Sequence, residues 1–85
     1  MKYEMLPEHM RDGMRAYIEH RVPPGGFLTA ALCNDLMGAC AKADRTNLHH
    51  LPDFCRFLYN YAPMVCHGSP EKVKAWLERK GGRDE

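Results

Sequence analysis

Four cysteines and five histidines are the residues of this chain with the most distinctive chemistry. Thiolate and imidazole are the ligands that zinc prefers, and a structural metal would stabilise a small core. The spacing does not fit such a site, because there is no C-x-x-C pair and Cys33 and Cys40 lie seven residues apart. We therefore predict small buried thiols, no metal site and no cofactor.

The adjacent residues Cys66 and His67 are the one candidate for a nucleophile and its base. A catalytic cysteine needs a neighbouring base and an electropositive, partly exposed setting. Side chains of adjacent loop residues usually diverge, and no carboxylate is identifiable that could orient the histidine. The sequence therefore predicts a protein without catalytic residues. A hydrolase that uses Cys66 and His67 is an alternative.

The Pro23–Gly26 segment, PPGG, offers a site of another kind, for an anion. Unpaired backbone N–H groups at a helix start bind anions, and glycine lets a phosphate approach the backbone closely. A plain turn is the alternative, because the remaining features of a P-loop or a dinucleotide fingerprint are missing. In the ligand-binding interpretation an arginine pairs with a phosphate, a threonine donates a hydrogen bond and a tyrosine stacks on a base. The candidate residues are Tyr17, His20, Arg21, Gly25, Gly26, Thr29 and Tyr61.

Aromatic residues are concentrated between Phe54 and Tyr61. A tyrosine has an apolar ring and a polar tip, so it suits a half-buried position, a partner interface or a platform for a base. Packing of these rings in the core, with one tyrosine at its rim, is the simpler interpretation. A partner interface or a ligand platform is the alternative.

The elements that must position these residues are separated by proline and glycine, which divide the chain into four segments with helical periodicity. Hydrophobic residues make up 45% of the chain and charged residues 27%, which is typical of a folded domain. A chain of 85 residues has room for one core. We predict a single all-α domain over residues 1–85, a small bundle of about four helices, with residues 1–6 and 82–85 frayed.

The second predicted helix, about residues 26–43, begins at the PPGG turn and is the expected central element. Its apolar stripe includes Leu28, Leu32 and Leu36, and its middle turns carry few charges. Such a helix is expected to be buried on more than one side, either inside the domain or against another copy of the chain. We therefore predict a homo-oligomer.

The first predicted helix covers about residues 7–20, and the third follows a cap at Asp44 or Thr46. Pro52 either starts the main part of the third helix, after a short separate turn, or kinks a longer helix. Pro63 closes it. The third helix therefore has two possible forms.

The last predicted helix has the clearest boundaries in the sequence. Ser69 is a good N-cap, Pro70 suits the first helical position, and Gly81 supplies the C-terminal stop. Residues 64–68 before it are predicted to form a loop. This helix is expected to lie on the surface, across the other helices.

Charge and hydropathy exclude several classes of partner. Lys and Arg number 12 against 11 Asp and Glu, without the clustered basic face of a DNA-binding protein. No apolar run approaches the about 18 residues that span a bilayer, and the N-terminus lacks the pattern of a signal peptide. We expect a cytoplasmic protein with free thiols, which binds neither DNA nor a membrane.

Five segments together have a distinctive pattern: a tyrosine-bearing helix, PPGGFLTA, NDL, FLYN-x-AP and C-x-GSPE-x-V. They lie at Tyr17–His20, Pro23–Ala30, Asn34–Leu36, Phe57–Pro63 and Cys66–Val73. In these segments the chain resembles small proteins encoded by phages and prophages. In its paired prolines and helical hairpin it is loosely similar to oligomeric phage sponge proteins, which sequester cyclic-nucleotide immune signals.

These resemblances imply a counter-defence protein of the phage-infected bacterial cytoplasm that works by stoichiometric binding. The expected ligand is an anionic, nucleotide-like signalling molecule at the PPGG helix start. The alternative is an inhibitor or regulator that binds a host immune protein through an aromatic helical surface.

Overall fold

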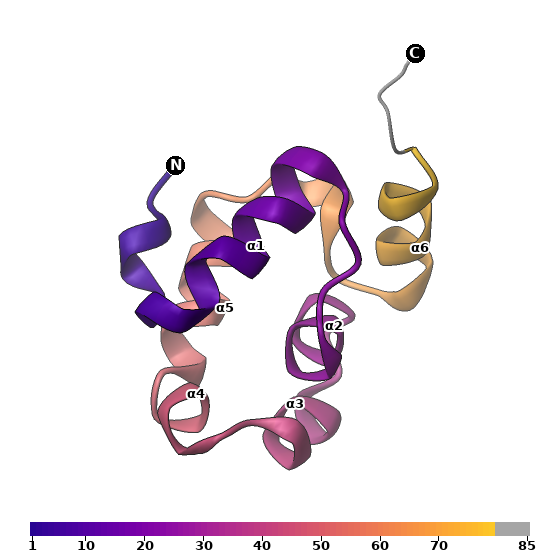
Figure 1. Ribbon diagram of the computed structural model, residues 1–85. Helices are drawn as coiled ribbons and strands as arrows, with labels where there is room; N and C mark the ends of the chain where they lie inside the picture. The colour runs from indigo at the N-terminus through magenta and orange to yellow at the C-terminus, as the bar shows by residue number, and fades with distance from the viewer. Residues whose placement is uncertain (80–85) are drawn as a thin grey trace.

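The computed structural model describes residues 1–79, which form an all-α bundle without strands (Figure 1). This confirms the predicted fold class. None of the helices in this range is both long and apolar enough to cross a bilayer. The predicted stop at Gly81 and the frayed residues 82–85 lie outside the described part of the chain. The elements are η1 (Tyr3–Met5), α1 (Glu8–His20), α2 (Gly26–Leu32), α3 (Leu36–Lys42), α4 (Arg45–His49), α5 (Leu51–Asn60), η2 (Met64–Cys66) and α6 (Pro70–Glu78).

Helix α1 ends where its periodicity predicts, at His20. The next residue, Arg21, has a left-handed backbone (φ 55°), and its N–H donates to the carbonyl oxygen of Tyr17 at 3.0 Å. This closes the helix with the αL motif, although glycine is the usual residue there. An arginine in this conformation costs about 1–2 kcal/mol, so packing of its side chain must hold it.

The predicted helix 26–43 is wrong as one continuous rod, because the chain breaks between α2 and α3. Asn34 is left-handed (φ 63°) and donates its N–H to Ala31 O at 3.1 Å, while Asp35 N–H donates to Ala30 O at 2.8 Å. These two bonds form a Schellman motif. Asparagine adopts the left-handed region more readily than other non-glycine residues, so α2 ends here.

Helix α3 starts in a new direction because Asp35 caps it, accepting a hydrogen bond from Gly38 N–H at 3.0 Å. The change of direction removes Leu36 from the stripe that Leu28 and Leu32 begin. Both of these leucines are buried, whereas the Leu36 side chain is 61% exposed. Helix α3 therefore presents apolar residues to the outside.

The region predicted as the third helix forms two helices, α4 and α5. Asp44 caps α4 by accepting a hydrogen bond from Asn47 N–H at 2.7 Å. Pro52 lies in the first turn of α5, where a backbone N–H would have no partner within the helix, so the missing N–H of proline costs no hydrogen bond. Of the two forms left open by the sequence, the structure has the one with a short separate turn.

Helix α2 lies at the centre of the bundle, where it packs against α3, α5 and α6 (Figure 1). Its Phe27 ring meets the edge of Phe54 from α5, with ring centroids 5.1 Å apart. The core is built from buried side chains of all helices except α4, and its largest fully buried members are Tyr17, Phe54, Phe57, Leu6, Met14, Leu32 and Cys66.

The N-terminal segment belongs to this core, which corrects the expectation that residues 1–6 are frayed. Tyr3 and Leu6 are buried, and the Tyr3 ring lies 5.4 Å from that of Phe57. The Tyr3 hydroxyl donates to Glu19 Oε2 at 2.8 Å. Burial and the Glu19 carboxylate raise the pKa of Tyr3 to about 12. Two apolar residues in a short turn thus anchor the segment.

Helix α6 begins as predicted, with Ser69 Oγ accepting a hydrogen bond from Lys72 N–H at 3.2 Å and Pro70 in the first position. It lies on the surface and buries Val73 and Trp76 against the other helices. The predicted loop before it contains the single 3₁₀ turn η2.

Candidate functional site

The predicted ligand residue Tyr17 is a core residue. Its side chain is fully buried, and its hydroxyl donates to the carbonyl oxygen of Cys66 at 2.6 Å. Burial raises the pKa of Tyr17 well above its usual value. A ring in this position has no open face on which a base could stack, so Tyr17 serves the packing of α1 against η2.

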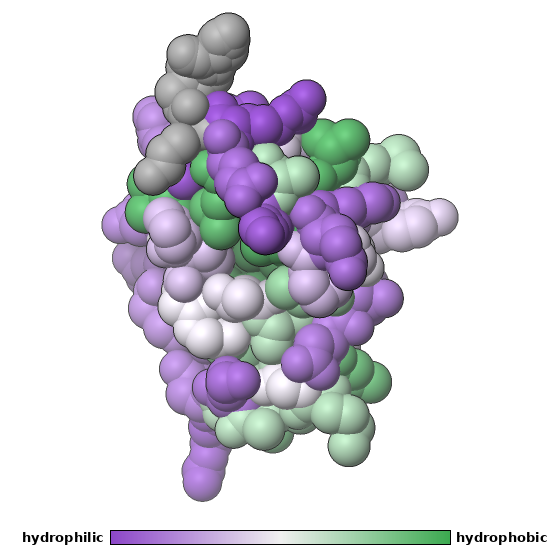
Figure 2. Space-filling view, turned by 90° about the vertical axis from the view of Figure 1, so that its right-hand side faces the viewer, coloured by the Kyte–Doolittle hydropathy of each residue, from purple (hydrophilic) through white to green (hydrophobic). Residues whose placement is uncertain are grey.

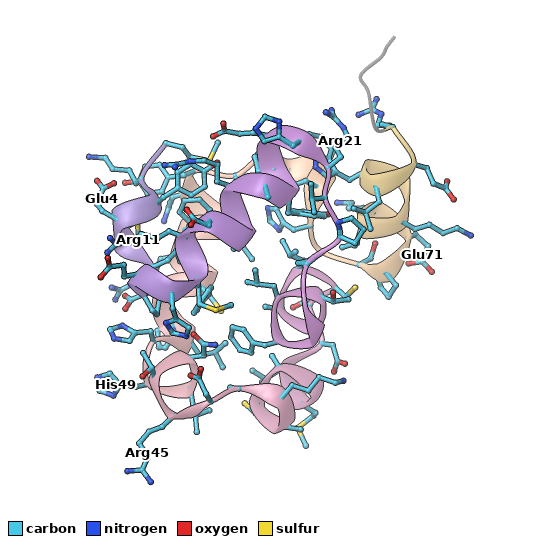
Figure 3. All side chains as sticks on the ribbon, viewed as in Figure 1. Glu4, Arg11, Arg21, Arg45, His49 and Glu71 are labelled. Carbon is cyan, nitrogen blue, oxygen red and sulfur yellow. The ribbon has the colours of Figure 1, made fainter. Side chains whose placement is uncertain are left out.

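The predicted phosphate partner Arg21 packs against α6 (Figure 3). Its guanidinium carbon lies 4.1 Å from the centre of the Trp76 ring, a cation–π contact. Its Nε atom is buried and has no hydrogen-bond partner. This contact holds Arg21 in its left-handed conformation, and it assigns the side chain to the seam between α1 and α6.

The remaining predicted residues do not gather in one place. Gly26 and Thr29 line a surface cavity of about 510 Å³, and Thr29 Oγ1 donates to Pro24 O at 3.4 Å. His20 and Gly25 are exposed and are not part of its lining. Tyr61 lies at the end of α5 against Phe57. The structure therefore brings two of the seven predicted residues together in this cavity.

Lys42 is the cation of this cavity, although sequence reasoning missed it. The break at Asn34 folds α3 back, so that the Lys42 stem crosses Gly26, where an added Cβ would lie 3.1 Å from Lys42 Cδ. The cavity also contains Asp35 and Cys33. A continuous helix 26–43 would have carried Lys42 away from Gly26, so the sequence pattern gave no signal for it.

The thiol of Cys33 in this cavity is not a nucleophile at neutral pH. Burial, followed by the charges of Asp35 and Glu71, raises its pKa. Because the thiolate is the reactive form, this position disfavours covalent chemistry. The cavity offers Lys42 and Thr29 for reversible binding of a polar ligand.

The Cys66–His67 pair has the wrong electrostatics for a hydrolase. Cys66 is fully buried, and burial raises the pKa of its thiol to about 11. Burial and the positive charge of Lys72 lower the pKa of His67, whose Nε2 atom is buried without a hydrogen-bond partner. The thiol therefore stays protonated at neutral pH, and the pair lacks the thiolate that a nucleophile needs.

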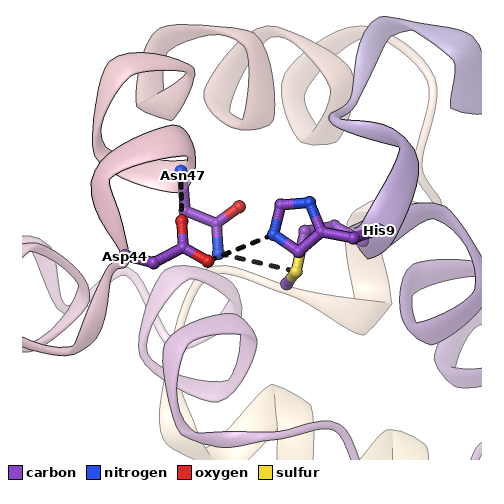
Figure 4. Close-up of polar contacts among 4 residues, drawn as sticks. His9, Asp44 and Asn47 are labelled. Atoms are coloured by element: carbon purple, nitrogen blue, oxygen red, sulfur yellow. Dashed lines mark hydrogen bonds and ion pairs between the residues drawn. The ribbon is translucent and has the colours of Figure 1, made fainter.

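A polar cluster links α1 to α4 (Figure 4). His9 Nε2 lies 3.2 Å from Asp44 Oδ2, and Asn47 Nδ2 donates to the Met10 sulfur at 3.5 Å. The Asn47 N–H bond, with a smaller contribution from His9, lowers the pKa of Asp44. No group of three metal-ligating side chains occurs in residues 1–79. The cluster serves to hold α4 against α1.

An exposed apolar surface lies beside a groove where η2 meets α6. Met64 is 77% exposed and Val65 is 55% exposed. A shallow groove of about 370 Å³ adjoins them. In the upper part of this face, hydrophobic groups lie at the left and at the right, with hydrophilic groups between them (Figure 2). We call these residues the η2–α6 surface. It consists of Met64 together with the groove residues Val65, Glu71, Lys72, Ala75, Trp76 and Arg79.

Comparison of the chain with protein-family models, with curated proteins and with solved structures found no match. The η2–α6 surface was missed in the sequence because Met64 and Val65 fall in a predicted loop. The sequence nevertheless contained an indication of this surface, since two large apolar residues between Pro63 and Cys66 are unusual for a solvated loop.

Proposed function

We propose that the protein is a stoichiometric binding protein that captures a partner protein through the η2–α6 surface. The observation that carries this proposal is the exposure of Met64 and Val65 beside a groove that contains Trp76. Burying one such aliphatic side chain stabilises a complex by about 1.5–3 kcal/mol. Methionine adapts to partners of different shape, and arginine is frequent in energetic centres of interfaces.

The charges around the groove favour an acidic partner segment. Lys72 on α6 and Arg79, the residue directly after it, line the groove together with the single carboxylate of Glu71. Opposite charges at the rim of an interface speed association and select the partner. The partner is thus a segment with an apolar side chain, which enters the groove, and carboxylates beside it, which face the two cations.

The resemblance to phage proteins suggests where this partner is found. A small protein without catalytic residues acts by occupying a surface, and in an infected bacterium a host immune or regulatory protein is the expected target. This gives the protein a cytoplasmic counter-defence role. The expected target offers an acidic and apolar docking segment.

A pull-down with matched variants tests the proposal. Tagged wild-type protein, Val65→Asp and Tyr59→Asp are each incubated with bacterial lysate, and retained proteins are identified by mass spectrometry. Tyr59 on α5 is 85% exposed and outside the groove, so its variant is the control. One protein should be retained in equimolar amount by wild type and control and lost with Val65→Asp. Equal retention by all three, or by none, contradicts the proposal.

The second candidate function, binding of a nucleotide-like anion, is favoured by one observation. Gly26, Thr29 and Lys42 line the same cavity of about 510 Å³, a volume typical of sites for small ligands. The carboxylate of Asp35 in the same cavity offsets the charge of Lys42, which weakens the attraction for phosphate. We therefore place this function second.

Isothermal titration separates the two functions. The probes are cyclic and adenosine-derived signalling nucleotides, titrated into wild type and Lys42→Ala. Binding by wild type that weakens at least about tenfold with Lys42→Ala, about 1.4 kcal/mol, would support the cavity. Absence of heat with every nucleotide in a folded sample retires the anion-binding function and leaves the protein-binding one untouched.

A further inference from the structure

The cavity beside Gly26 and Thr29 holds two opposite charges that are not paired with each other. Lys42 and Asp35 both line it, and the ion pairs formed within residues 1–79 include neither side chain. An anion that Lys42 attracts is repelled by the carboxylate of Asp35. The two charges together suit a ligand that carries one charge of each sign.

The two charges lie at opposite ends of α3. Asp35 caps its start and Lys42 is its last residue, seven positions further on. Seven positions make nearly two turns, which places both residues on one face of the helix, about 10 Å apart along its axis. Because α3 packs back on α2 (Figure 1), this face borders the cavity between them.

The positive end of the cavity lies where α2 begins. An added Cβ at Gly26 would lie 3.1 Å from Lys42 Cδ and 3.7 Å from Lys42 Cε. Because glycine has no side chain, the Lys42 stem can lie across the start of α2. A carboxylate of a ligand at this end can pair with the ammonium group of Lys42.

The negative end lies beside Cys33, where α2 stops. The exposed Asp35 carboxylate accepts the capping bond from Gly38 N–H at 3.0 Å, and it has further lone pairs that can accept from a ligand. Burial, followed by the charges of Asp35 and Glu71, raises the pKa of the Cys33 thiol. Two carboxylates thus act on this end, which favours an ammonium group.

The wall between the two ends offers an acceptor and small apolar groups. Thr29 Oγ1 donates its hydrogen to Pro24 O at 3.4 Å, so its lone pairs can accept from an N–H group of a ligand. Pro24, Ala30 and Pro70 supply apolar lining. An extended peptide spans about 3.3–3.6 Å per residue, and three residues therefore cover the about 10 Å between the charges.

We propose that this cavity binds a free peptide of about three small residues, with its N-terminal ammonium group at Asp35 and its C-terminal carboxylate at Lys42. Such a peptide matches the charge at each end, and its backbone N–H groups match Thr29. The cavity volume of about 510 Å³ is typical of sites for small ligands. Its lining shares no residue with the η2–α6 surface, so the site can be tested without a partner protein.

Titration with trialanine, followed by calorimetry and by backbone amide NMR shifts, tests the site. Wild type should bind with a dissociation constant on the order of 0.1–1 mM, as expected for a ligand of this size. The amide signals of Thr29, Cys33 and Lys42 should move most. N-acetyl-trialanine and trialanine amide each lack one charge and should bind at least about tenfold more weakly. No binding of trialanine at about 10 mM, or shifts confined to other helices, overturns the proposal.

Two variants assign the ends of the peptide. Asp35→Asn keeps a side chain that caps α3, and Lys42→Gln changes an exposed residue, so both variants should fold. Asp35→Asn should weaken trialanine binding at least about tenfold and leave N-acetyl-trialanine unchanged, while Lys42→Gln should do the same with trialanine amide. Lys74→Gln, exposed on α6 and outside the cavity, is the control. Equal weakening of charged and blocked peptides by either variant would contradict the proposal.

Asp35→Asn also separates this ligand from a nucleotide. Loss of the carboxylate should strengthen the binding of any anionic nucleotide and weaken that of trialanine, because the two ligands place opposite charges beside residue 35. Binding of a nucleotide without binding of trialanine would overturn the peptide site and support the second candidate function. Neither result bears on the capture of a partner protein by the η2–α6 surface.

Discussion

The indole N–H of Trp76 donates to the carbonyl oxygen of Tyr17 at 2.9 Å, and the bond is buried. It joins α6 to α1, although 59 residues separate them in the sequence. The same indole lines the groove of the η2–α6 surface, and its ring makes the cation–π contact with the guanidinium of Arg21. One residue thus fixes α6 and shapes the surface proposed to bind the partner.

Removing this hydrogen bond should destabilise the fold. We expect Trp76→Phe to lower the free energy of unfolding by about 1–2 kcal/mol, since a net hydrogen bond contributes about 1 kcal/mol and the smaller ring packs less well. The loss stays modest because the Tyr17 carbonyl keeps its bond from Arg21 N–H. Urea unfolding followed by circular dichroism measures it. Tyr59→Phe is the matched control, and an equal loss in both variants refutes the role of the indole N–H.

The left-handed Arg21 allows two substitutions to be compared directly. Arg21→Ala keeps the backbone strain and loses the contact with Trp76, which costs about 0.5–2 kcal/mol. Arg21→Gly loses the same contact but relieves about 1–2 kcal/mol of strain. Arg21→Gly should therefore be the more stable variant by about 1 kcal/mol. Thermal or urea unfolding of the pair checks the order, and the reverse order would show that φ at residue 21 is not left-handed.

Acidification should weaken the fold through His67. Burial lowers its pKa in the folded state, while in the unfolded chain the pKa is about 6.5. Below that pH the unfolded chain takes up the proton more readily, so stability falls with a slope of at most about 1.4 kcal/mol per pH unit and levels off below the folded-state pKa. His67→Gln should remove this part of the pH dependence. Urea midpoints from about pH 7.5 to 5 test it, and unchanged pH dependence in the variant contradicts the assignment.

The break between α2 and α3 depends on Asn34. Asn34→Gly should match or exceed wild-type stability by up to about 1 kcal/mol, because glycine has no penalty at positive φ. Asn34→Ala should lose about 1 kcal/mol, since alanine has no side chain to hydrogen-bond locally. Urea unfolding compares the two variants. A more stable Asn34→Ala would favour the continuous helix that the periodicity predicted.

Local signals predicted a large part of the fold. The Ser69-Pro70 start of α6 and the end of α1 follow from residues beside them in the chain. The α2–α3 break did not, because the stripe of Leu28 and Leu32 continues through Leu36 and nothing in the pattern separates it. The Schellman turn forms in place of a continuous helix because it allows α3 to pack back on α2.

The candidate site was harder to predict because it depends on distant contacts. Tyr17 and Arg21 were expected to face a ligand, and both have partners far along the chain, Cys66 and Trp76. Lys42 reaches the cavity only through the α2–α3 break. A single sequence gives the residue types and their spacing. It does not show which side chains already have partners elsewhere in the fold.

The most direct test of the proposed function is the affinity of the purified partner for wild type and for Val65→Asp, measured by titration calorimetry. Val65 is 55% exposed, so the variant should keep its stability within about 0.5 kcal/mol. A buried aspartate facing an acidic segment should weaken binding at least about tenfold, or about 1.4 kcal/mol. Equal affinity of a folded Val65→Asp would contradict binding through the η2–α6 surface.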